Sequence, residues 1–92
     1  MKILLSFNGY FRKMFEQNPV EIEMVDGAAV DDIFIEIDRL YGATLPKAIW
    51  SHEKKRFRGP ISVSVDQKVV KDFSYILKDG QQVSITRFLI GG

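Results

Sequence analysis

The sequence predicts a single α+β domain in which one main helix packs across one face of a mixed sheet of about five strands. First, 92 residues are enough for one hydrophobic core but not for two. Second, several short segments alternate apolar and polar residues with the period of two that is typical of strands. Third, one segment alone has the period of an amphipathic helix, and a single apolar stripe is most simply buried against a sheet.

Two strands are expected before the helix. In the first, Lys2–Phe7, the apolar residues fall on one face at every second position. In the second, Val20–Val25, apolar residues alternate with Glu21 and Glu23, which is the pattern of a sheet with one face in water. Residues 10–19 between them form a connection whose aromatic side chains require burial.

Residues Ala29–Tyr41 are expected to form the helix. Asp31 and Asp32 lie in its first turn, where the helix dipole favours negative charge. Gly42 is placed to end it in the left-handed conformation. The predicted buried stripe consists of Val30, Ile33, Ile37, Leu40 and Tyr41, with Phe34 at its margin.

The second half of the chain is expected to supply the other three strands. Residues 43–60 are predicted to be a long loop, with at most one helical turn and with Trp50 as an anchor. Strands are expected at Ile61–Val65, Lys68–Val70 and Gln82–Leu89, with residues 73–77 crossing the core between the last two. The first and last strands are the most apolar, so they are expected to be central and parallel.

Composition excludes several classes of function. The net charge of +1 gives no electrostatic argument for nucleic-acid binding. The chain has no cysteine and a single histidine, His52, so a thiol nucleophile and an imidazole-based metal site are not expected. No apolar stretch approaches the roughly 18 residues of a membrane span, and the apolar start of the chain is too short for a signal peptide. A cytoplasmic location is expected.

The sequence ends with an apolar strand followed by Gly91-Gly92. Two residues without Cβ form a thin thread that can enter a channel too narrow for side chains. A terminal α-carboxylate is ionised at neutral pH and must be activated before it reacts, typically as an acyl-adenylate. The preceding pattern of Leu77, Asp79-Gly80 and Val83 makes a chance pair of glycines less plausible.

From Ile61 to Gly92 the sequence resembles the MoaD/ThiS family of ubiquitin-like sulfur carriers, which includes the small subunit of molybdopterin synthase. An alternating strand, a short strand at 66–70, Leu77 before Asp79-Gly80, and a final strand into Gly91-Gly92 follow the family order. The first strand and the helix agree in kind. The resemblance implies one β-grasp domain over residues 1–92 with a flexible Gly-Gly tail from about residue 88.

The resemblance also implies a carrier and not an enzyme. Gly92 matches the residue that is adenylated and then thiolated in the family, and Gly91 matches its flexible neighbour. The implied partners are an ATP-dependent adenylating enzyme and a sulfur acceptor, either the large subunit of a synthase or a thiazole synthase. The chain itself is expected to bind no cofactor.

Two positions leave the pathway open. Gln81-Gln82 stand where molybdopterin-synthase subunits commonly carry acidic residues, and Phe88-Leu89 stand where they carry a proline pair. Residues 43–60 are longer than in the thiamine carriers, and on length the molybdopterin branch is slightly favoured over the thiamine branch.

Two further features have alternative interpretations. Phe88, Leu89 and Ile90 stand in series, so at least one should point outward and could dock a partner, unless a twist of the strand partly buries all three. The basic run 54–58 could bind RNA or could be a solvated loop, and the acidic helix favours the loop. His52 is expected to be exposed and without a partner.

A ubiquitin-like modifier, joined through Gly92 to lysines of target proteins, shares the adenylation step and stays open as an alternative function.

Overall fold

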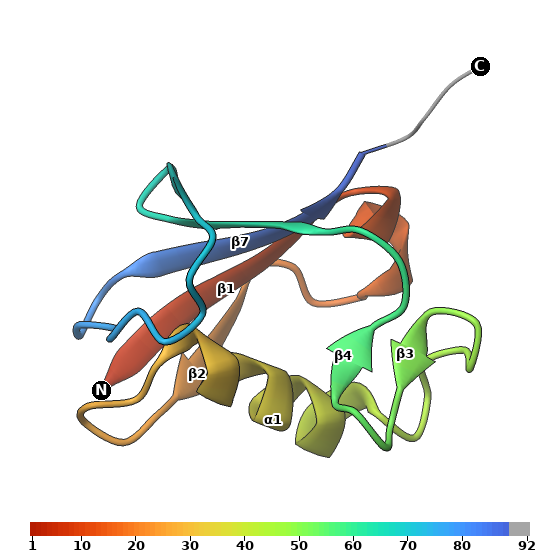
Figure 1. Ribbon diagram of the computed structural model, residues 1–92, viewed down its shortest axis with the longest axis horizontal. Coiled ribbons are helices and arrows are strands. Elements are labelled where there is room, and N and C mark those ends of the chain that lie inside the picture. The colour runs from red at the N-terminus through yellow and green to blue at the C-terminus, as the bar shows by residue number, and fades with distance from the viewer. Residues whose placement is uncertain (89–92) are drawn as a thin grey trace.

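Five strands form one mixed sheet, with the helix α1 (Val30–Tyr41) packed across it. The computed structural model describes residues 1–88 and is shown in Figure 1. β1 and β7 are adjacent and parallel and lie inside the sheet, as predicted, and all other neighbours are antiparallel. The strands, in spatial order, are β2 (Val20–Glu23), β1 (Lys2–Gly9), β7 (Gln82–Arg87), β5 (Ser62–Val65) and β6 (Lys68–Val70).

Alternation along the central strands builds the core. Ile3, Leu5 and Phe7 of β1 are fully buried on the face that α1 covers. On the opposite face, Ser6 and Ser84 form a hydrogen bond of 2.7 Å between their hydroxyl groups across the parallel β1–β7 pair. The sheet therefore has one apolar and one polar face, as the period-two pattern predicts.

The buried stripe of α1 differs from the prediction at three residues. Val30, Ile33, Phe34 and Ile37 are buried, whereas Leu40 is exposed and Tyr41 is only partly buried. At about 100° per residue, Leu40 lies roughly 70° from the centre of that stripe and Phe34 about 50° from it. Phe34 also has a neighbour that the sequence did not predict, because the ring of Phe73 lies 5.4 Å away.

Residues 73–77 cover the first turn of α1 with their backbone. The N–H of Val30 donates to the carbonyl oxygen of Tyr75 at 3.0 Å, and the N–H of Asp31 donates to that of Phe73 at 2.9 Å. Only Leu77 of this segment is deeply buried, and the Tyr75 side chain is exposed. The predicted crossing of the core is therefore made by backbone hydrogen bonds more than by side chains.

The two ends of α1 are set by carboxylates. At the start, the N–H of Ala29 donates to the carboxylate of Asp32 at 2.8 Å. At the end, Gly42 has φ −54°, so the prediction of a left-handed residue is wrong. A Cβ at Gly42 would lie 2.6 Å from a carboxylate oxygen of Asp38. Glycine at this position therefore leaves room for the Asp38 side chain.

The segment 43–60 contains a small hairpin, which the prediction of a long loop with at most one helical turn did not include. β3 (Trp50–Ser51) pairs with β4 (Arg56–Phe57) as a separate two-stranded sheet beside the end of α1 (Figure 1). Trp50 is buried, as predicted for an anchor, and its ring lies 4.9 Å from that of Phe57. Phe57 in turn stacks on Phe11 at 4.4 Å. The hairpin therefore extends the core.

The connection between β1 and β2 begins with a 3-10 helix, Tyr10–Met14. Phe11 and Phe15 are buried, and Phe15 stacks on Phe7 with 3.6 Å between ring centroids. Two of the three aromatic residues of this connection are therefore buried in the core, as predicted, while Tyr10 is about half exposed.

Candidate functional site

The candidate site lies where β7 leaves the sheet, at the root of the C-terminal segment. β7 is the middle strand, and its last residues are held on both sides, with Gly9 of β1 opposite Arg87 and Ser62 of β5 opposite Thr86. The strand ends at Arg87 and not at Leu89 as predicted. Phe88 is the first residue beyond it, and 70% of Phe88 is exposed. The direction in which the chain leaves the sheet is thus fixed by two neighbouring strands.

Arg87 fastens this end of β7 to the loop before β5. Its Nε donates to the carbonyl oxygen of Pro60 at 3.2 Å, and its Nη2 donates to that of Arg58. The guanidinium carbon lies 4.9 Å from the centroid of the Phe11 ring, which is within cation–π range. The loop, the strand end and the core are therefore joined by one side chain.

Gly9 allows β1 to approach β7 at this point. It has φ +64°, and a Cβ there would lie 2.0 Å from the carbonyl oxygen of Arg87. No other residue type fits without moving the backbone. The Asn8-Gly9 pair, which the sequence indicates only as a turn, is thus a close-contact position beside the site.

Two shallow hollows flank the end of β7. One, of about 320 Å³, lies on the β5 side and is lined by Pro60, Ile61 and Phe88 among others. The other, of about 430 Å³, lies on the β1 side and is lined by residues of the segment from Gly9 to Met14, including Tyr10, Arg12 and Lys13. Aromatic residues and arginine are enriched at protein interfaces. The exposed Tyr10 and Phe88 and the nearby Arg12 lie together at the end of β7.

The predicted site residues are only partly described. Phe88 is exposed, as expected for at least one residue of the series Phe88, Leu89 and Ile90. Leu89 and Ile90 lie outside the described residues, and so do the predicted reactive residues Gly91 and Gly92. Arg87 was missed, because its contacts with Phe11 and with the loop before β5 depend on tertiary structure that no local pattern indicates.

A second polar cluster surrounds Asp38 at the end of α1. Its carboxylate accepts hydrogen bonds from Trp50 Nε1 at 2.8 Å and from Lys55 Nζ at 3.2 Å, and it lies 2.7 Å from His52 Nδ1. These contacts, the Trp50 hydrogen bond first, lower the pKa of Asp38 from 3.8 to about 2. His52 is exposed, as predicted, but the prediction that it has no partner is wrong. The cluster ties the β3–β4 hairpin to α1.

Among residues 1–88 there is no group of three or more acidic or imidazole side chains that could hold a metal ion. In that same part of the chain, none of the helices has the length and apolar character needed to cross a membrane.

The sheet order, the parallel central pair and the single covering helix define the protein as a ubiquitin-like β-grasp domain. The structure is similar to that of SAMP1 from Haloferax volcanii, with a TM-score of 0.79, 11% identity and 100% of both chains covered. It is also similar to a putative molybdopterin converting factor, subunit 1, from Pyrococcus furiosus. That match has a TM-score of 0.70 and 22% identity, and it covers 96% of this chain and 98% of the other.

A third similar structure is part of a complex. It is the protein–protein complex of subunits 1 and 2 of the molybdopterin-converting factor from Helicobacter pylori, with a TM-score of 0.58, 17% identity and full coverage of both chains. No protein-family model and no curated protein matches the sequence. The similarity at these identities establishes the β-grasp fold, as predicted from the sequence.

Proposed function

We propose that this protein is a sulfur carrier of the MoaD/ThiS type, whose Gly92 carboxylate is converted to a thiocarboxylate. The observation that carries the proposal is the combination of the fold with the position of the diglycine. Gly91-Gly92 follow the central strand β7 after Phe88, Leu89 and Ile90, with Phe88 exposed beside two hollows. Structures of the same fold include a molybdopterin converting factor subunit aligned over nearly its whole length.

The chemistry requires a partner enzyme with ATP. The Gly92 carboxylate attacks the α-phosphorus of ATP, and pyrophosphate leaves, which gives an acyl-adenylate. A sulfide equivalent then attacks the acyl carbon, the bond from carbon to the phosphate oxygen breaks, and AMP leaves with the electron pair. The product is a thiocarboxylate with sulfur in place of one oxygen. No oxidant or reductant is consumed when sulfide is the donor.

The end of β7 suits this reaction because the strand is held firmly in the sheet, and the reacting carboxylate follows it five residues later in the sequence. Gly9, Arg87 and the paired strands fix where the tail begins. We infer that Phe88, Leu89 and Ile90 contribute apolar docking contacts while Gly91 and Gly92 enter the partner's site. Docking through exposed aromatic residues would hold the tail in position during adenylation.

Among the pathways, we favour molybdopterin synthesis over thiamine synthesis. One similar structure is named as a putative molybdopterin converting factor, subunit 1, and another is a complex of subunits 1 and 2 of such a factor. The corresponding partner for this chain would be the large subunit of a molybdopterin-type synthase, with the carrier as its small non-catalytic subunit. A cytoplasmic location agrees with ATP-dependent activation.

The test is the mass of the C-terminal peptide. The protein is purified from its native host, or treated with its adenylating enzyme, ATP and a sulfur source, and the C-terminal peptide is sequenced by fragmentation. We expect sulfur in place of one oxygen at Gly92. Fragmentation is needed because oxidation of any of the three methionines adds almost the same mass. A plain carboxylate on Gly92 under these conditions, or a native chain that continues beyond it, would contradict the proposal.

Two variants sharpen this experiment. Adding one alanine after Gly92 moves the carboxylate out of register with the partner's site and should abolish the sulfur adduct. Gly27→Ala is the matched control, since a Cβ at Gly27 has nothing within 4 Å, and it should keep the adduct. Equal labelling of the extended chain and the control would show that the position of the terminal carboxylate does not matter, which contradicts the proposed register of Gly92 in the partner's site.

Two other functions would give different results. A protein modifier would form higher-mass conjugates in cell extract that vanish when Gly91 and Gly92 are deleted. An RNA-binding module would bind through the basic run 54–58. That run is partly occupied by the protein itself, because Arg56 pairs with Asp31 and Lys55 with Asp38. These contacts favour the structural interpretation of the basic run.

A further inference from the structure

β2 forms an open edge of the sheet, with its outer backbone groups available for pairing. In the described residues β2 pairs with β1 alone. Just beyond β2, Met24 and Met1 exchange both backbone hydrogen bonds, at 2.8 and 2.7 Å. Because hydrogen-bonded and non-bonded pairs alternate in an antiparallel ladder, the N–H and C=O groups of Glu21 and Glu23 point away from β1. Such an edge can accept another strand.

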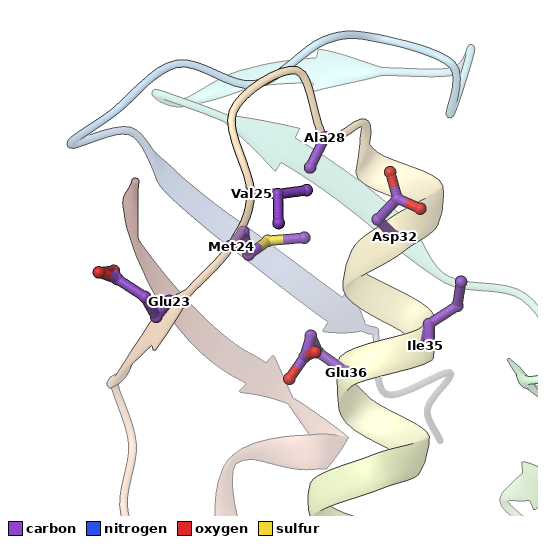
Figure 2. A pocket seen from close by; sticks show the side chains of 7 residues that line it. All are labelled: Glu23, Met24, Val25, Ala28, Asp32, Ile35 and Glu36. Carbon is purple, nitrogen blue, oxygen red and sulfur yellow. The ribbon is translucent and has the colours of Figure 1, made fainter.

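A hollow of about 230 Å³ lies between this edge and α1. Figure 2 shows Met24 and Val25 across from Glu36 of α1, and Ile35 of the same helix also lines the hollow. Val25 is 78% exposed and Ile35 is 50% exposed, and both line the hollow. The hollow thus offers apolar surface directly beside free backbone groups.

Both faces of this edge carry carboxylates, and no lysine or arginine lines the hollow. Asp32 and Glu36 lie on the α1 side, where Asp32 accepts from the N–H of Ala29, and Glu21 and Glu23 are exposed on the other side of the strand. Nearby cations offset this charge only in part. Arg39 pairs with Glu36 at 2.8 Å, and Lys2 lies 3.8 Å from Glu21. The terminal ammonium group of Met1 lies 3.8 Å from Asp26, which leaves Glu23 without a basic side chain beside it in the described residues. In a protein with a net charge of +1, this edge therefore favours a basic ligand.

We propose that β2 and the hollow beside α1 bind an extended basic peptide of another protein, which adds to the sheet as a sixth strand. The geometry of the edge sets the residue pattern of the peptide. Ile22 and Met24 are buried on the α1 side of the sheet, while Glu21 and Glu23 are exposed on the other side. Figure 2 shows the Glu23 side chain pointing away from α1. Alternate residues of the peptide face α1 and should be apolar, and those between lie beside the glutamates and should be lysine or arginine.

A second copy of this chain does not fit the same edge. Pairing two β2 strands would place Glu21 and Glu23 of one copy beside those of the other, and like charges across a strand pair are unfavourable. The two glutamates thus keep copies apart and select a basic strand. Binding at β2 does not involve Gly92, so it stands or falls independently of the sulfur-carrier function.

The test uses a capped seven-residue peptide that alternates valine and lysine, with the full-length protein labelled for NMR. We expect amide shifts confined to β2, residues 24–28 and the first half of α1, with new protection from hydrogen exchange at Glu21 and Glu23. A peptide with glutamate in place of lysine should bind at least tenfold more weakly. A peptide with proline at its centre should also lose binding, because it lacks the N–H that the edge requires.

Protein variants locate the site. Glu23→Lys and Ile35→Lys are exposed changes that should preserve the fold, and each should weaken binding at least tenfold. Val69→Lys is the matched control, since Val69 is an exposed aliphatic residue on the opposite edge strand β6, and it should bind as the wild type does. Shifts at β6, equal binding of the lysine and glutamate peptides, absence of binding, or self-association through β2 would each overturn the proposal.

Discussion

Replacing Gly9 by alanine tests how much the close contact between β1 and β7 contributes to stability, beyond the cost of a positive φ. Gly9→Ala should destabilise the protein by about 3 kcal/mol, because the new Cβ would meet the carbonyl oxygen of Arg87 at 2.0 Å and would also carry a positive φ. The measurement is the midpoint of urea unfolding, followed by tryptophan fluorescence of Trp50.

The control for this prediction is Gly27→Ala. Gly27 also has a positive φ, +86°, but a Cβ there meets nothing within 4 Å, so only the backbone cost of about 1 kcal/mol should appear. If both substitutions cost the same, the close approach of β1 to Arg87 is not the reason that residue 9 is glycine.

Asp38 should make stability depend on pH in the acid range. Its folded pKa of about 2 lies below the ordinary value of 3.8, so the charged form is favoured by folding. The contribution is therefore complete above about pH 4 and is lost as the pH falls through 2. Asp38→Asn should lower the melting temperature at neutral pH, and its difference from the wild type should shrink between pH 4 and pH 2.

The exposed Glu53→Gln serves as the comparison for Asp38→Asn, because it removes one carboxylate from the same hairpin without touching Trp50 or His52. Thermal melts of both variants across that pH range provide the test. A difference between Asp38→Asn and the wild type that stays constant down to pH 2 would rule out the carboxylate as its source.

At the scale of the element, α1 and the central strands could be predicted from the sequence because their periodicity is local. The apolar period of two in β1 and the period of 3.6 in α1 each depend on residues a few positions apart. The choice between Phe34 and Leu40 as buried residue could not be predicted, since it depends on where the stripe meets Phe73. Gly42 was mispredicted for a similar reason, because its neighbour is the Asp38 side chain.

The β3–β4 hairpin was beyond prediction because its strands are two residues long. A two-residue strand shows no alternation. It forms here because Trp50 and Phe57 pack on one another and on Phe11, and because Asp38 bonds the Trp50 indole. The same reason applies to the candidate site. The diglycine could be recognised from the sequence, but the contacts of Arg87 and Gly9 that fix the root of the tail could not.

At the scale of the whole molecule, the fold and the proposed reactive end should be separable. Deleting Gly91 and Gly92 should abolish the sulfur adduct and change the free energy of unfolding by less than about 0.5 kcal/mol, because β7 ends at Arg87 and the described core lies before it. Urea unfolding and the C-terminal peptide mass of the same preparation provide both readouts. A loss of several kcal/mol would mean that the diglycine supports the fold, which the proposed carrier role does not require.

The first turn of α1 has a consequence for how ATP is used. The start of a helix attracts phosphate groups when its N–H groups are free. Here the Val30 and Asp31 N–H groups bond the carbonyl oxygens of Tyr75 and Phe73, and the Asp32 carboxylate lies at the same turn. The positive end of the helix is thus already neutralised by the protein itself. This helix start therefore offers no site for the triphosphate, which agrees with the proposed reaction, in which the activating enzyme binds ATP and the carrier contributes the group to be activated.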